Sequence, residues 1–187
     1  MDDVTLPPAR VKGLMMGYPQ ILHHSAIAGV TGSCLQLRID VEHGLLLDCG
    51  LFHAAEVSPE NGTGGVSRAI DFSLTGIKAL VAIHVYINHV GRIPDQLAAD
   101  FKGPILCSEL SVKLLPIVLE DTFKLGFDRD QQQVWRYLEL LGLRIMSLPY
   151  DNWFALVDTA QSAIVIAAGA MVDGLSITSR SCCKSAA

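Results

Sequence analysis

Hydrophobic residues follow two different patterns along the first half of the chain, and both are typical of β-structure. Residues 30–39 alternate between apolar and polar or small side chains, and residues 44–50 follow after a short polar turn. This arrangement predicts a β-hairpin whose second strand is buried. Residues 77–85, which follow a glycine and lead into a histidine-containing segment, are apolar except for Lys78 and His84. Such a run predicts a central strand that is buried on both faces.

Apolar residues at helical spacing begin after residue 92. The further predicted elements are a short helix over 93–101, a strand over 103–107, helices over 110–125 and 130–142, and strands over 144–148 and 163–168. Ser108 is the expected N-cap of the helix over 110–125, and Pro116 should kink that helix or start a second one. Residues 54–69 are expected to form a loop and residues 150–159 a turn. Paired strands, then a central strand with helices after it, predict an α/β or α+β layered fold.

The composition of the 187 residues limits the classes of protein that fit. Half of the residues are hydrophobic, only 18% are charged, and the mean hydropathy is +0.38. A disordered chain would have fewer apolar residues. No window approaches the roughly 18–20 apolar residues that a membrane-spanning helix needs. A single domain of this size cannot bury all of its apolar residues, so the composition raises the question of what covers the surplus.

Charge and cysteine content indicate a compartment and argue against one class of partner. The net charge is −5, and Lys and Arg show no clustered excess that would suit the phosphate backbone of a nucleic acid. Nucleic acid is therefore an unlikely partner. Five cysteines, an odd number without a secretory signal before them, favour free thiols in a reducing compartment. We expect a cytoplasmic protein that does not associate with membranes.

The segment that could carry chemistry follows the predicted central strand. His84 and His89 lie where that strand leads into a helix, and α/β proteins commonly build their sites at this edge of a sheet. Two histidines at this spacing are nevertheless more often packed or capped side chains than metal ligands. The pair alone therefore does not predict a metal site.

Five ordered blocks of the sequence resemble one protein family. They are residues 30–34, 45–52, 84–94, 101–105 and 114–121. In order and spacing, from about residue 11 to residue 156, they are similar to the N-terminal half of the metallo-β-lactamase-fold RNA-processing hydrolases with a β-CASP insert. The resemblance implies an αββα sandwich with two facing sheets and outer helices. It also implies descent from zinc-dependent ribonucleases and a chain that holds about half of that sandwich.

The positions that hold zinc in that family are partly replaced in this chain. The family motif H-x-H-x-D-H corresponds to four residues here, His84, Tyr86, Asn88 and His89. Each metal would keep one ligand from this loop and lose the other. The resemblance also places Ala170 where the family has a further histidine ligand. A neutral phenol and an amide are poor ligands for zinc, so the motif is degenerate.

These departures favour a catalytically inactive, truncated relative that acts as a self-associating structural or interaction protein. On this interpretation no residue is catalytic, no cofactor is needed, and Asp48 orients the loop by hydrogen bonding, as the resemblance implies. Residues 1–175 would form a partial domain and residues 176–187 an irregular tail. The inner face of its single sheet would be bare, so we expect a homodimer with an apolar interface.

Two alternatives stay open at this point. A working metal-dependent, ribonuclease-like hydrolase would bind zinc through His84 and His89. Its further ligands would come from His23, His24, His53, Asp173 or a second subunit. The three replaced ligand positions and the negative net charge argue against it. The other alternative is a gene fragment without selected function, which sequence cannot separate from a selected pseudo-enzyme.

Overall fold

The computed structural model describes residues 18–24, 32–51, 70–126, 131–158, 162–169 and 174–181, and within these ranges it contains two sheets and four helices. The larger sheet comprises β1 (Gln20–His23), β2 (Leu35–Arg38), β3 (Gly44–Leu47), β4 (Ile77–Val81), β5 (Ile105–Ser108) and β6 (Ile145–Leu148). The smaller sheet comprises β7 (Trp153–Asp158), β8 (Ser162–Gly169) and β9 (Gly174–Ser181). The helices are α1 (Ile87–Val90), α2 (Ile93–Ala98), α3 (Glu109–Gly126) and α4 (Gln131–Arg144).

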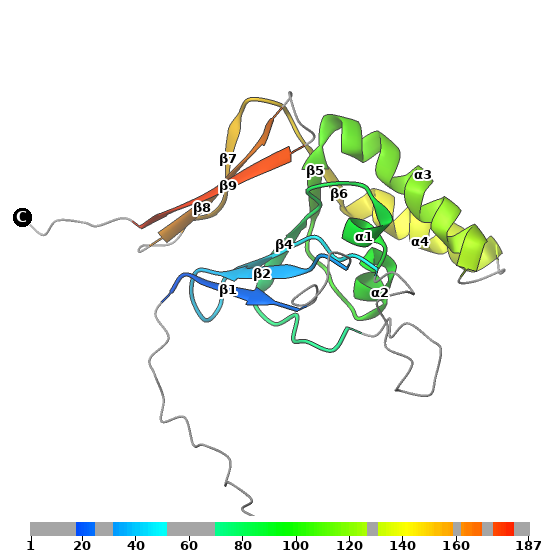
Figure 1. Cartoon of the computed structure of the whole chain (residues 1–187), viewed down its shortest axis with the longest axis horizontal. Coiled ribbons are helices and arrows are strands. Elements are labelled where there is room, and N and C mark those ends of the chain that lie inside the picture. The colour runs from blue at the N-terminus through cyan, green and yellow to red at the C-terminus, as the bar shows by residue number, and fades with distance from the viewer. Residues whose placement is uncertain are drawn as a thin grey trace, which may run out of the picture.

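The larger sheet is mixed, with the strands in the order β1-β2-β3-β4-β5-β6. The pairs β1–β2 and β2–β3 are antiparallel, whereas β3, β4, β5 and β6 run parallel to one another. The helices lie on one side of this sheet and the three-stranded sheet on the other (Figure 1). The predicted layered α/β fold, a mixed sheet with flanking helices, is thus confirmed.

The two faces of the larger sheet belong to two different cores. Leu80 packs under the helices, and its neighbour Val81 packs in the cluster on the opposite face; both are completely buried. Phe154 and Leu156 of β7 pack against that second cluster. The inner face is therefore not bare, and the expectation that this chain supplies only one sheet was wrong. Phe154 and Leu156 of the second sheet cover part of this face.

Two segments that were expected to be irregular are strands. The predicted turn over 150–159 contains β7, and the predicted tail over 176–187 begins with most of β9, while residues 182–187 lie outside the described ranges. Residues 153–157 form a short apolar run, and residues 175–178 alternate between apolar and polar side chains, so both local patterns are compatible with strands. Both segments pair antiparallel with β8, which confirms the predicted strand over 163–168.

The two long helices follow the predicted pattern closely. Ser108 accepts a hydrogen bond from the backbone N–H of Ser111 at 3.3 Å, as expected of the N-cap of α3. Pro116 lies inside α3 without dividing it, and α4 continues past Gly142 to Arg144. No helix in the described part of the chain is long and apolar enough to cross a membrane. The loop predicted over 54–69 lies outside the described residues.

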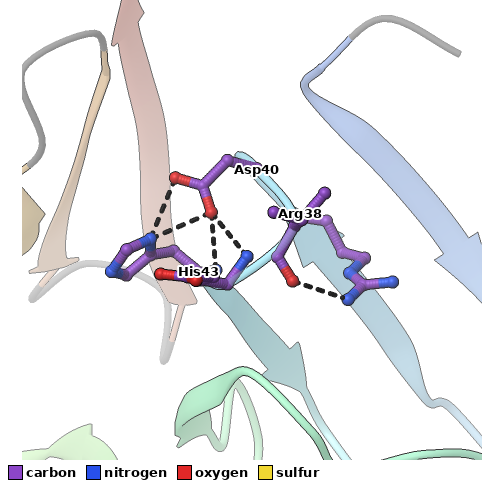
Figure 2. Close-up of polar contacts among 5 residues, drawn as sticks. Arg38, Asp40 and His43 are labelled. Carbon is purple, nitrogen blue, oxygen red and sulfur yellow. Dashed lines mark hydrogen bonds and ion pairs between the residues drawn. The ribbon is translucent and has the colours of Figure 1, made fainter. Parts of the chain in front are cut away.

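The turn between β2 and β3 is closed by one carboxylate (Figure 2). Asp40 Oδ1 accepts hydrogen bonds from the backbone N–H groups of Glu42 and His43, at 2.7 and 2.8 Å, and His43 Nδ1 lies 2.9 Å from both carboxylate oxygens. Desolvation acts to raise the pKa of Asp40, but these hydrogen bonds outweigh it and lower the pKa. Arg38 adds a bond to the turn by donating to the carbonyl of Val41. The turn sets the register of the hairpin.

Candidate functional site

The candidate site lies at the edge of the larger sheet where β3 and β4 end. Because these neighbouring strands are parallel, their carboxyl ends meet at the same edge. Asp48 follows β3 directly, and the segment 82–92, which holds both His84 and His89, follows β4 and contains α1. The site is therefore built from two chain segments about 40 residues apart that adjacent strands bring together.

Asp48 lies at the centre of this site and is only 2% exposed. Its carboxylate Oδ1 accepts a hydrogen bond from the backbone N–H of Ile83 at 2.8 Å. Its Oδ2 accepts from Ser33 Oγ at 3.2 Å and lies 2.7 Å from His89 Nδ1. The bond to Ile83 diverts that N–H away from a neighbouring strand, which explains why β4 ends at Val81 although the apolar run predicted a strand to residue 85. Asp48 thus holds the segment 82–92 by both carboxylate oxygens.

The ring of His89 is oriented by this carboxylate. The hydrogen bond with Asp48 raises the pKa of His89, and it outweighs the opposing effect of partial burial. The His89 side chain is 28% exposed. With Nδ1 engaged by Asp48, Nε2 is the ring nitrogen left for another contact. Metal-binding histidines are oriented in the same way by a carboxylate, so the orientation of His89 is compatible with metal binding.

The other side chains of the loop contact each other. The His84 ring lies against the Tyr86 ring, with centroids 3.8 Å apart and planes tilted by 57°, and its centroid is 5.8 Å from that of His89. His84 Nδ1 accepts the backbone N–H of Tyr86 at 3.2 Å, so this nitrogen already has a partner. Tyr86 is 65% exposed. Asn88 contributes its main-chain carbonyl, which accepts the N–H of Ser33 at 2.9 Å.

The backbone of the loop packs directly on the residues that follow β3. The N–H of Cys49 donates to the carbonyl of His89 at 2.6 Å, and the N–H of Arg92 donates to the carbonyl of Cys49 at 2.8 Å. A Cβ atom on Gly50 would lie 1.6 Å from the carbonyl oxygen of Asn88. Only glycine permits this approach. The loop geometry is therefore set by main-chain contacts as well as by Asp48.

A catalytic zinc site uses three protein ligands and an open position. Within the described ranges, no three His, Cys, Asp or Glu side chains are placed to hold a metal ion. Of the alternative ligands, His24 is engaged elsewhere: its Nε2 is 2.7 Å from Gln36 Oε1, and its ring stacks on Phe72. His23 is part of β1. The positions of His53, Ala170 and Asp173 lie outside the described residues.

Sequence reasoning did not single out two residues that shape the site. Ser33 donates both its N–H, to Asn88, and its hydroxyl, to Asp48. Gly50 permits the close approach of the loop. Both lie inside the blocks of family resemblance, so the signal was present there. Neither residue type indicates chemistry by itself, which is why residue-level reasoning passed over them.

Comparison with known proteins places this geometry in a family context, although no protein-family model matches the chain. Ribonuclease TTHA0252 of Thermus thermophilus is 31% identical over 137 residues, which are 73% of this chain and 30% of that protein. Transcription termination factor FttA of Cenarchaeum symbiosum is 23% identical over 130 residues, which are 66% of this chain and 19% of that protein. The chain therefore spans less than a third of the length of these relatives.

The fold has helices on one face of a mixed sheet and a second sheet on the other. The chain is a relative of the metallo-β-lactamase-fold, β-CASP RNA-processing hydrolases, as its sequence similarity to these proteins shows.

Two solved structures match much of this chain at low sequence identity. Zn(2+)-bound PqqB from Methylobacterium extorquens has a TM-score of 0.44 at 10% identity, covering 81% of this chain and 50% of that one. Rubredoxin oxygen:oxidoreductase from Desulfovibrio gigas has a TM-score of 0.43 at 15% identity, covering 83% and 32%.

Proposed function

We propose that this chain is a non-hydrolytic relative of the RNA-processing hydrolases and acts as a structural or interaction protein. The observation that carries the proposal is the set of donors at the sheet edge: two imidazoles, a phenol and an amide. One imidazole is bound to Asp48, and the other accepts a backbone N–H through Nδ1. A hydrolytic zinc centre needs a third strong ligand before it lowers the pKa of a bound water towards 7. This loop supplies none.

The proposal includes a location. The three described cysteines, Cys34, Cys49 and Cys107, are free and buried, which suits a reducing compartment. We therefore place the protein in the cytoplasm.

Metal content and RNA cleavage test the absence of hydrolysis. The chain would be produced in medium supplemented with zinc or manganese, purified by gel filtration, and analysed by inductively coupled plasma mass spectrometry. We expect far less than one metal ion per chain, and no cleavage of a labelled single-stranded RNA. Ribonuclease TTHA0252, prepared in the same way, is the positive control for cleavage.

A variant with both His84→Ala and His89→Ala separates a real activity from a contaminating nuclease. Cleavage that persists in this variant does not come from the loop. Near-stoichiometric metal together with cleavage that the double variant loses would overturn the proposal in favour of a metal-dependent hydrolase.

We propose further that the chain self-associates through the part of the inner face that its second sheet leaves exposed. Ile21, Leu37 and Leu45 lie in one row across β1, β2 and β3. Leu45 is completely buried, Leu37 is half-buried, and Ile21 is 64% exposed. The smaller sheet contacts β5, so it covers less of the inner face of the larger sheet towards β1. A second copy placed across a two-fold axis would bury this row.

Sedimentation velocity at micromolar concentration tests this association. We expect a dimer for the unmodified chain and a monomer for Ile21→Lys, because a lysine placed in the interface would bring an unpaired charge into an apolar contact. Ile117→Lys on α3 is the matched control, since Ile117 is 62% exposed but lies on the opposite side of the sheet. A compact monomer of the unmodified chain, or a dimer that only Ile117→Lys dissociates, would contradict the proposed interface.

A further inference from the structure

Two cysteine side chains lie directly beneath the loop of the candidate site. Cys34 precedes β2 and Cys49 follows β3 closely, and both are completely buried. The antiparallel register, with Leu35 opposite Leu47, places Cys34 opposite Asp48. Regular alternation along β3 would then turn Cys49 to the face opposite that of Cys34.

The backbone at Asp48 interrupts this alternation. Its φ of 61° is left-handed, and beyond it Cys49 belongs to the same buried cluster as Cys34, on the helix side of the sheet. The N–H of Gly50 donates to the carbonyl of Ser33 at 2.9 Å, so beyond Asp48 the pairing of the two segments is shifted by one residue and Cys49 lies opposite Cys34. Neighbouring strands lie about 4.7–4.9 Å apart, and this spacing is inside the Cα–Cα range of about 4.4–6.8 Å that disulfides need. Facing residues on these two segments therefore meet the Cα–Cα requirement of a disulfide.

We infer that Cys34 and Cys49 form an oxidisable dithiol, which hydrogen peroxide converts to a disulfide beneath the site loop. One sulfur attacks the O–O bond of the peroxide and takes one oxygen as a sulfenic acid, with release of one water. The second thiol attacks that sulfur and displaces the hydroxyl as another water. The two thiols lose two electrons in total, and these reduce one peroxide to two waters.

The surroundings of the thiols slow this reaction. The neighbouring Cys34 thiol and burial both raise the pKa of Cys49. Burial alone raises the pKa of Cys107 to about 12, which makes it an internal comparison without a neighbouring thiol. Because the pair is buried, it reacts more slowly than an exposed thiol.

A disulfide at this position would bear on the loop above it. The backbone of Cys49 holds the loop through His89 and Arg92. A cross-link to Cys34 ties this contact to the start of β2 and restricts the unfolded chain, so it stabilises the oxidised form. The inference does not depend on whether the loop binds metal.

Peptide mass spectrometry of the full chain tests the inference. The reduced protein is treated with hydrogen peroxide, its remaining thiols are blocked with N-ethylmaleimide, and it is digested without reductant. We expect residues 34 and 49 in one cross-linked species, about 2 Da lighter than the two reduced peptides together, because two hydrogens are lost. Dithiothreitol should reverse the linkage, and oxidation should raise the melting temperature by several degrees.

Serine variants provide controls for the same experiment. Cys107→Ser should keep both the cross-link and the rise in melting temperature, whereas Cys34→Ser and Cys49→Ser should lose both. The inference is wrong if N-ethylmaleimide still alkylates Cys34 and Cys49 in the unmodified chain after peroxide treatment. It is also wrong if they oxidise to sulfinic acids without linking to each other.

Discussion

Replacing Gly50 by alanine should lower the free energy of unfolding by about 3 kcal/mol or more. The added Cβ would lie 1.6 Å from the carbonyl oxygen of Asn88 and 2.7 Å from the backbone nitrogen of His89. These are main-chain atoms, so no side-chain rotation relieves the clash. The loop would have to move, which breaks its hydrogen bonds with Cys49. Urea denaturation followed by circular dichroism measures the loss.

Gly142→Ala is the matched control for this substitution. Gly142 lies within α4, and a Cβ added there meets no atom within 4 Å. Alanine is the better helix former, so this variant should gain up to about 1 kcal/mol. If Gly50→Ala were as stable as the unmodified chain, the close packing of the loop against residues 49–50 would be refuted.

The parts of the fold that the sequence predicted are those in which local pattern and tertiary burial agree. The central strand was visible because residues 77–81 are apolar apart from Lys78, and α4 because its apolar residues repeat at helical spacing. Trp153 at the start of β7 is 58% exposed, and the β9 segment mixes serine, threonine and arginine with few large apolar residues. Both segments pair with β8, and a short local pattern does not specify its partner strand.

For the candidate site, the sequence predicted several of the residues but not their geometry. The histidine segment and Asp48 were identified, the latter only through the family resemblance. The geometry adds what spacing cannot show, namely that Ser33 and the N–H of Ile83 converge on the same carboxylate. The bare inner face was wrongly expected because β7 and β9 were missed. Because these strands were missed, too much apolar surface was expected to be exposed. The proposed self-association now rests on the row of Ile21, Leu37 and Leu45.

Asp48→Ala should lower the free energy of unfolding by about 2–4 kcal/mol, because it leaves buried donors without their acceptor. The N–H of Ile83, the hydroxyl of Ser33 and Nδ1 of His89 all lose a partner that is 2% exposed. Asp48→Asn is the matched control. It keeps the shape and one acceptor oxygen but turns an NH₂ group towards the remaining donors, so we expect an intermediate loss. Equal stability of the alanine variant and the unmodified chain would show that the carboxylate does not hold the loop.

The pH dependence of stability separates the contact of Asp48 with His89 from its hydrogen bonds with Ile83 and Ser33. Because Asp48 raises the pKa of His89 in the folded chain, their charged contact stabilises the fold fully below the ordinary histidine pKa of about 6.5. The contribution is lost as the pH rises through the raised pKa of the folded state. The difference in free energy of unfolding between the unmodified chain and His89→Gln should therefore be larger below about pH 6 than above about pH 9. The hydrogen bonds from Ile83 and Ser33 involve no histidine charge, so the loss in Asp48→Ala should persist in part at the higher pH. A difference for His89→Gln that is constant over this range would show that the Asp48–His89 contact stabilises the loop only as a neutral hydrogen bond.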